Sequence, residues 1–129
     1  MGVGEMGITS FRDLRVWNSG MDLVERIYRV TERFPQRETF GLASQMQRAA
    51  VSIPSNIAEG HMRSPRREYL HFLSVAHGSL AELQTQVEIA QRLEYLPPSA
   101  CADLLERTAS LSRQLHSLRS ALAADAPNP

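Results

Sequence analysis

The sequence predicts an all-α protein, an antiparallel up-down-up-down four-helix bundle. Four segments carry apolar residues at alternating steps of four and three, the spacing that places one apolar stripe along a helix. Short connections with prolines separate these segments, and short connections favour antiparallel neighbours. No segment alternates apolar and polar residues as a half-buried strand does. We expect a flexible N-terminus at 1–10, one bundle over 11–124 and a disordered tail at 125–129.

The first helix is expected over Phe11–Arg33, because Pro35 cannot continue it. Its predicted core stripe consists of Leu14, Trp17, Met21, Val24, Tyr28 and Thr31. A second apolar stripe lies beside it and consists of Val16, Gly20, Leu23, Ile27, Val30 and Phe34. Together the two stripes are wider than a bundle core requires, so a further surface should cover one of them.

The second helix carries a stripe of Leu42, Met46, Ala49, Ile53 and Asn56. Thr39 is a plausible N-cap, and Gly60 is the expected left-handed residue that ends the helix. Pro54 removes one backbone hydrogen bond inside the helix and should kink it. Asn56 falls on the core stripe, with Glu59 one turn later, and a buried asparagine can fix helix register and assembly state. We assign these four residues, Pro54, Asn56, Glu59 and Gly60, structural roles.

The third and fourth helices are separated by a proline pair. Ser64 as N-cap and Pro65 at the first helical position start the third helix, which should end near Leu93. Its stripe consists of Tyr69, Leu73, Ala76, Leu80, Leu83, Val87 and Ala90. After Pro97 and Pro98, the stripe of the fourth helix consists of Leu104, Thr108, Leu111, Leu115, Leu118 and Leu122.

Composition gives little support for catalysis. The four histidines lack metal-ligand spacing, and Cys101, the only cysteine, has no motif of a nucleophile or a disulfide partner. We therefore expect no enzyme activity, no metal and no cofactor. With no signal peptide and no apolar run of about 20 residues, a cytoplasmic protein that does not enter membranes is expected.

The polar faces of the helices indicate which helices meet other copies. The first and third helices have wide apolar faces, whereas the fourth is polar outside its leucine stripe. We expect the first and third helices to face other subunits of a homo-oligomer. The alternative is a monomer with a slightly irregular core.

Charge is balanced overall but unevenly distributed. Fourteen arginines balance fourteen acidic residues, and several form acid-first pairs four residues apart, such as Asp22 with Arg26 and Asp103 with Arg107. Antiparallel packing would gather four carboxylates, Asp13, Glu59, Glu68 and Asp125, at one bundle end with seven arginines: Arg12, Arg15, Arg63, Arg66, Arg67, Arg113 and Arg119. This basic end is a candidate for binding phosphate groups.

Four motifs of the chain are Phe11 to Trp17, Gly41 to Ala50, Ser52 to Gly60 and Glu68 to Leu83. Together they resemble the bacterial family of four-helix proteins named for 23S ribosomal RNA intervening sequences. Family members resemble the accessory variability protein of diversity-generating retroelements, a pentameric ring that engages nucleic acid and a reverse transcriptase. The resemblance therefore implies a homopentamer. Where members often carry two basic residues before the alanine pair, this chain has Gln47 and Arg48, and Arg48 joins the candidate set.

Two hypotheses follow for function. The first is a non-enzymatic oligomeric accessory protein that binds RNA or DNA through the basic end. The second is a scaffold that recruits a partner protein, for example a reverse transcriptase, through its apolar faces without contacting nucleic acid. Sequence-specific readout is not expected, since most of the eight aromatic residues fall on core stripes.

Overall fold

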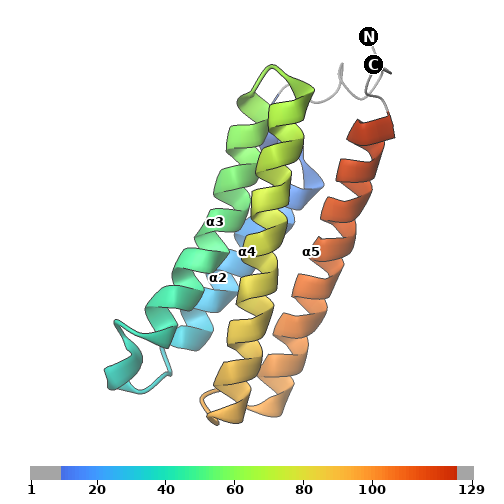
Figure 1. Cartoon of the computed structure of the whole chain (residues 1–129). Coiled ribbons are helices and arrows are strands. Elements are labelled where there is room, and N and C mark those ends of the chain that lie inside the picture. The colour runs from blue at the N-terminus through green and yellow to red at the C-terminus, as the bar shows by residue number, and fades with distance from the viewer. Residues whose placement is uncertain (1–9, 125–129) are drawn as a thin grey trace.

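The computed structural model describes residues 10–124, and within them all regular structure is helical (Figure 1). The four long helices are α2 (Arg15–Thr31), α3 (Leu42–Met62), α4 (Arg66–Arg92) and α5 (Pro98–Ala124). Two short 3-10 helices accompany them, η1 (Phe11–Asp13) before α2 and η2 (Gln36–Glu38) before α3. The prediction of an all-α protein with four helices is confirmed. Residues 1–9 and the expected tail at 125–129 lie outside the described residues.

Neighbouring helices contact each other in opposite sequence order. Ser19 of α2 donates to Gln114 of α5, whereas Arg26, two turns later in α2, pairs with the earlier Asp103 of α5. The hydrogen bonds between α4 and α5 follow the same order. In Figure 1 the α3–α4 connection lies at one end of the bundle, called here the upper end. The α2–α3 and α4–α5 connections lie at the other, the lower end.

The core comes from the stripes predicted for α3, α4 and α5, but α2 buries most of its second stripe together with Thr31 of the first. Met21 and Tyr28, placed in the core by the sequence, are 39% and 44% exposed, and this prediction is wrong. The buried residues of α2 are Val16, Gly20, Leu23, Ile27 and Thr31. Gly20 lies on this stripe beside Pro54 of α3, and a Cβ atom at this position would lie 3.5 Å from Pro54, in ordinary van der Waals contact.

The start of α3 differs from the prediction. Gly41, not Thr39, is the N-cap residue. The side chain of Glu38 supplies the capping acceptor, because its Oε1 receives the backbone N–H of Leu42 at 3.0 Å. This hydrogen bond is the largest cause of the lowered pKa of Glu38, and a second hydrogen bond, donated by the hydroxyl of Tyr95, lowers the pKa further. The carboxylate of Glu38, four residues before Leu42, thus takes the capping role that was expected of the Thr39 hydroxyl.

Gly60 does not end α3 in a left-handed turn. The helix continues to Met62, and no glycine among the described residues has a positive φ. A Cβ atom at Gly60 would lie 2.8 Å from the Cβ of Phe72 and 3.1 Å from a ring atom of Tyr69. The glycine therefore permits the close approach of α3 and α4. The start of α4 is also shifted, since Pro65 is its N-cap and Arg66 its first residue.

Pro54 and Asn56 lie within α3. Pro54 is buried, and the helix continues beyond it for two more turns. Asn56 is half-buried, and its Nδ2 donates to the backbone carbonyl of Ser52 at 2.7 Å and to its hydroxyl at 2.9 Å. Ser52 in turn bonds to Ser79 of α4 at 2.8 Å. Asn56 therefore belongs to a polar link between α3 and α4 at the edge of the core.

Candidate nucleic-acid interface

The candidate arginines of the upper end come from separate elements. Arg12 lies in η1, Arg63 follows α3 as its C-cap, and Arg66 and Arg67 open α4. Arg119 lies near the end of α5. Figure 1 shows these segments at the same end of the bundle. The structure thus places residues that are distant in sequence on one end, but their surroundings differ.

Arg63 is held by two carboxylates. Its guanidinium lies 2.9 Å from Glu59 and 3.3 Å from Glu68, and it also stacks over the ring of Phe72 at 5.1 Å. The hydrogen bond to Glu59 is the main cause that raises the pKa of Arg63. Arg63 and Glu59 therefore join the end of α3 to the start of α4, and the charge of this arginine is balanced within the chain.

Arg15 and Arg113 line one groove. A hollow of about 490 Å³ separates the start of α2 from the second half of α5, with both arginines in its wall. Its other lining residues are Leu14, Val16, Ser110, Gln114, Ser117 and Leu118. Arg113 also lies 3.6 Å from Glu106, but both side chains are largely exposed, so the pair is screened by water. The groove combines two cations with hydroxyl groups over an apolar floor.

Arg119 belongs to a small polar cluster between α4 and α5. Its Nη1 lies 3.1 Å from Nδ1 of His77, whose Nε2 lies 2.8 Å from the hydroxyl of Ser112. Burial lowers the pKa of His77, and the charges of Arg119 and His116 lower it further. His77 is therefore neutral at pH 7, with Nδ1 accepting from the arginine and Nε2–H donating to the serine.

Two candidates lie apart from these groups. Arg48 is in the second turn of α3, towards the lower end, where it lines a hollow of about 400 Å³ with Tyr28 and Val51. Arg12 is exposed, and its guanidinium lies 4.7 Å from the ring centre of Phe11. The structure therefore does not bring Arg48 to the basic end.

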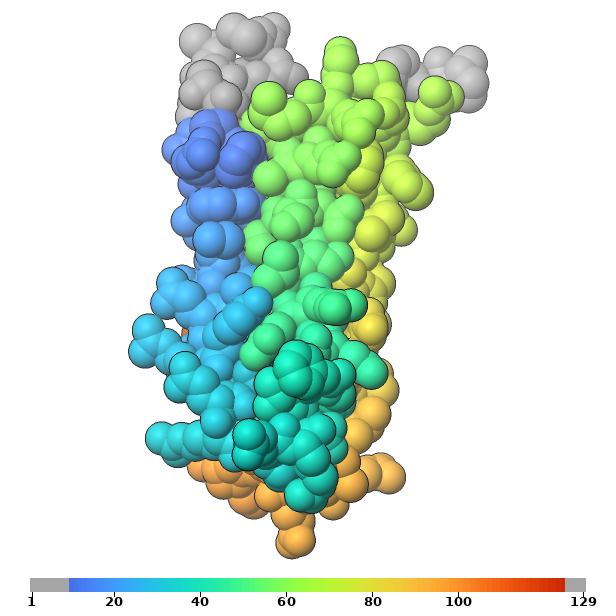
Figure 2. Space-filling model, turned by 90° about the vertical axis from the view of Figure 1, so that its left-hand side faces the viewer, coloured from blue at the N-terminus to red at the C-terminus, as the bar shows by residue number. Residues whose placement is uncertain are grey.

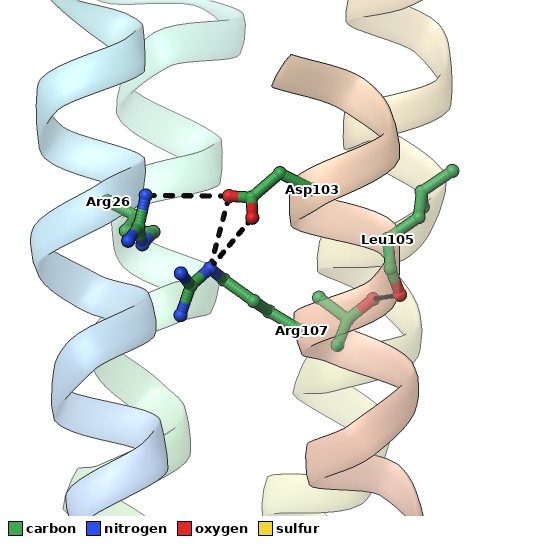
Figure 3. Close-up of polar contacts among 5 residues, drawn as sticks. Arg26, Asp103, Leu105 and Arg107 are labelled. Atoms are coloured by element: carbon green, nitrogen blue, oxygen red, sulfur yellow. Dashed lines mark hydrogen bonds and ion pairs between the residues drawn. The ribbon is translucent and has the colours of Figure 1, made fainter. Parts of the chain in front are cut away.

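A further arginine cluster crosses the seam between α2 and α5. Figure 3 shows Asp103 of α5 between Arg26 and Arg107, at 3.5 Å and 3.1 Å. The pair of Asp103 with Arg107 was predicted from its spacing, whereas the bond to Arg26 was not. A contact between helices depends on how each helix is rotated, and no local spacing reveals that. All three side chains are partly exposed, and their charges are paired with each other. The cluster therefore joins α2 to α5 more than it provides positive charge for a ligand.

Residues 10–124 offer few features of a catalytic centre or of a membrane protein. Among residues 10–124, no group of three histidine, cysteine, aspartate or glutamate side chains is placed to hold a metal ion. No helix in this range is long and apolar enough to cross a membrane. Cys101 is buried, and burial is the main cause that raises its pKa, which disfavours the reactive thiolate.

These features define a four-helix protein with an arginine-rich end. Its sequence matches the family model described as 23S rRNA-intervening sequence protein over residues 12–117. The chain belongs to this family, as its motifs indicated. The name of the family indicates no catalytic activity.

A solved structure has a similar fold. It is a protein of unknown function from the S23 ribosomal protein family of Bacteroides thetaiotaomicron. The two chains are 20% identical with a TM-score of 0.76, and the match covers 81% of this chain and 95% of the other. At this identity the likeness shows the fold alone. No curated protein matches the sequence.

Proposed function

We propose that the protein is a cytoplasmic, non-enzymatic accessory protein that assembles with copies of itself and binds RNA or DNA through its upper end. The bundle is taken as antiparallel, which the opposite order of the helix contacts supports. The bound groups are phosphates, held by charge and hydrogen bonds and without sequence readout.

The groove between Arg15 and Arg113 carries this proposal. The N-cap of α2, Leu14, makes no side-chain capping bond, and an anion beside Arg15 would supply the acceptor that the first amides of the helix lack. Arg113 and the hydroxyls of Ser110 and Ser117 line the same hollow. A phosphate bound there would receive charge-assisted hydrogen bonds from two helices.

The start of α4 supports the proposal independently. Arg66 and Arg67 lie in the first turn, where the helix dipole is positive and further cations are unfavourable. The N-cap residue, Pro65, provides no side-chain acceptor. A phosphate near this turn would offset the repulsion, and Arg67 is exposed to receive it.

Titration of fluorescently labelled single-stranded RNA and DNA at rising salt tests the proposal. The logarithm of the affinity should fall linearly with the logarithm of the salt concentration, by about 0.7 for each phosphate contact. The double variant Arg15→Gln, Arg113→Gln should bind more weakly, with a slope smaller by about 1.4, since two contacts are lost. The pair Arg66→Gln, Arg67→Gln should act in the same direction.

Arg92, an exposed arginine at the lower end, serves as the control. Arg92→Gln, in the last turn of α4, removes one positive charge and should leave the slope unchanged, whereas the single variants Arg15→Gln and Arg113→Gln, which also remove one charge each, should each lower the slope by about 0.7. Arg48→Gln tests a candidate that lies outside the upper end. A wild-type slope near zero, or equal losses in the single Arg92 and Arg15 variants, would refute nucleic-acid binding at the upper end.

The alternative function is a scaffold for another protein, and one observation favours it. The hollow of about 400 Å³ between α2 and α3 contains the exposed side chains of Tyr28 and Val51. In this case Tyr28→Ser should abolish recovery of one defined partner after nuclease treatment, while the arginine variants should not.

A further inference from the structure

Phe40 is the most exposed large apolar side chain of the described residues. It lies between η2 and α3 in the α2–α3 connection and is 96% exposed. In Figure 2 this connection, in teal, lies at the lower end of the face formed by α2 and α3. A fully exposed phenylalanine gains nothing from the core of its own chain, and its burial elsewhere would be favourable.

The connection around Phe40 is held in place. Glu38 accepts the backbone N–H of Leu42 at 3.0 Å with one oxygen and the hydroxyl of Tyr95 at 2.8 Å with the other. The backbone N–H of Gly41 also bonds to the carbonyl of Glu38 at 3.0 Å. These bonds tie the segment on both sides of Phe40, so little conformational entropy is lost when the ring is buried by a partner.

A mainly apolar pocket lies at the same end. It measures about 240 Å³ and is lined by Val30, Tyr95, Leu96, Pro97 and Ala100, together with Arg29 and Arg33. A cavity of roughly 150 Å³ is enough to hold a benzene ring. The pocket is therefore large enough for a phenyl ring, and the exposure of Phe40 shows that the chain's own phenylalanine does not fill it.

We propose that Phe40 of one copy inserts into this pocket of the next copy. The inference rests on the proposed self-assembly and names the contact that produces it. The phenylalanine and the pocket are different surfaces of one chain, so the contact is head-to-tail, and repeated head-to-tail contacts close into a ring when the rotation permits.

The lining residues suit an aromatic ring. Tyr95 offers its own ring for an offset or edge contact, and its hydroxyl already positions the connection that carries Phe40. Arg29 and Arg33 also line the pocket, and an arginine beside the bound ring can stack its guanidinium on a phenyl face. The ring is an anchor within a larger contact, because a phenylalanine covers only about 150–250 Å² while a stable interface covers about 800 Å² on each partner.

Two single variants remove the two halves of the contact. Phe40→Ala deletes the inserted ring, and Ala100→Phe fills the pocket from within. Each should weaken association between copies about ten- to a hundredfold, as expected for one buried phenylalanine. Met62→Ala is the control, since Met62 is 73% exposed but lies at the upper end of α3, and it should assemble like the wild type. Molar mass by light scattering and sedimentation velocity measures the outcome.

Mixing the two variants makes the test specific. The Phe40→Ala variant keeps an open pocket, and the Ala100→Phe variant keeps the Phe40 ring. One copy of each can therefore join through a single intact contact, with the ring of the second in the pocket of the first. The equimolar mixture should form dimers of one variant with the other and nothing larger. Thermal melts by circular dichroism confirm that each variant is folded, and Ala100→Leu replaces Ala100→Phe if the latter melts early.

Three results would overturn the inference. They are wild-type assembly in Phe40→Ala, wild-type assembly in both pocket variants, and an equimolar mixture that stays monomeric or rebuilds the full assembly. In these cases an assembled wild type would leave the proposed function standing. A wild type that is monomeric at all concentrations would remove this contact and the self-assembly, while the salt titration would still decide nucleic-acid binding.

Discussion

Two glycine-to-alanine substitutions test how closely α3 and α4 approach each other. Gly60 and Gly78 both lie inside helices, in α3 and α4. A Cβ atom at Gly60 would lie 2.8 Å from the Cβ of Phe72, whereas one at Gly78 would have no neighbour within 4 Å. The same chemical change is therefore made once against a neighbouring helix and once in open space.

The magnitude follows from two opposing effects. Alanine is better than glycine in a helix interior by about 0.8–1.0 kcal/mol, because it restricts the unfolded chain more. Gly78→Ala should therefore raise the free energy of unfolding by up to about 1 kcal/mol. At Gly60 the added methyl meets the Cβ of Phe72, which cannot move without the backbone of α4. Overpacking of this kind costs about 1–3 kcal/mol.

Gly78 lies in the middle of α4 and Gly60 in the last turn of α3, so the helix preference for alanine is at most as large at Gly60, and the difference between the two variants reports mainly the steric cost. Gly60→Ala should be less stable than Gly78→Ala by about 1–3 kcal/mol. For a chain of this length, each kcal/mol corresponds to a melting temperature change of about 3–5 °C. Urea unfolding followed by circular dichroism measures the free energies, and thermal melts check the order of stability.

The decisive comparison is the sign of the Gly60 effect. Equal stabilisation by both substitutions would mean that α3 and α4 move apart at little cost, and the explanation of Gly60 as a close-contact residue would be refuted. Equal destabilisation would mean that Gly78 also contacts a surface, which the chain alone does not provide.

Two further predictions concern charged groups. Because burial lowers the pKa of His77 below its ordinary value of 6.5, the unfolded chain binds more protons than the folded chain in this range, so this part of the stability should be present above pH 6.5 and be lost as the pH falls from 6.5 through the lower pKa of the folded state. His77→Gln should lose this part of the pH dependence of the urea midpoint, and an unchanged profile would contradict the proton assignment. Asp103→Asn breaks an ion pair that is about half exposed and should lower the free energy of unfolding by less than about 1 kcal/mol, whereas Leu104→Ala, one residue further and buried, should lower it by about 2–5 kcal/mol. Comparable losses in these two variants, measured by urea unfolding, would show that the ion pair is more than a surface contact.

The boundaries between α4 and α5 were predictable because prolines and apolar spacing act locally. The expected end near Leu93 agrees with its place as the C-cap of α4, and Pro98 begins α5 directly after the predicted break. The buried face of α2 was not predictable in this way, since two adjacent stripes offered similar apolar character. The stripe that is buried contains Gly20, where Pro54 packs, and a glycine adds no apolar signal to a sequence pattern.

Gly60 shows a second limit of sequence interpretation. Glycine near a helix end is typical of a left-handed cap, but it is also typical of close helix contact, and the two causes have the same sequence. Only the position of Phe72 distinguishes them. The same limit applies to the basic end. The topology assigned the arginines to this end, but it could not show that two carboxylates balance the charge of Arg63 or that Arg15 and Arg113 line one groove, because both depend on side-chain placement.

The proposed surfaces divide between the two ends of the molecule. The arginine groove lies towards the upper end, and the Phe40 contact and its pocket lie at the lower end. An assembly joined at the lower ends would leave every upper end free and hold several grooves at fixed spacing. Because each groove offers only a few phosphate contacts, a single copy would bind weakly, whereas several linked copies on one strand would bind far more tightly. If the proposal holds, self-assembly would be the condition under which a protein with no net charge holds a polyanion.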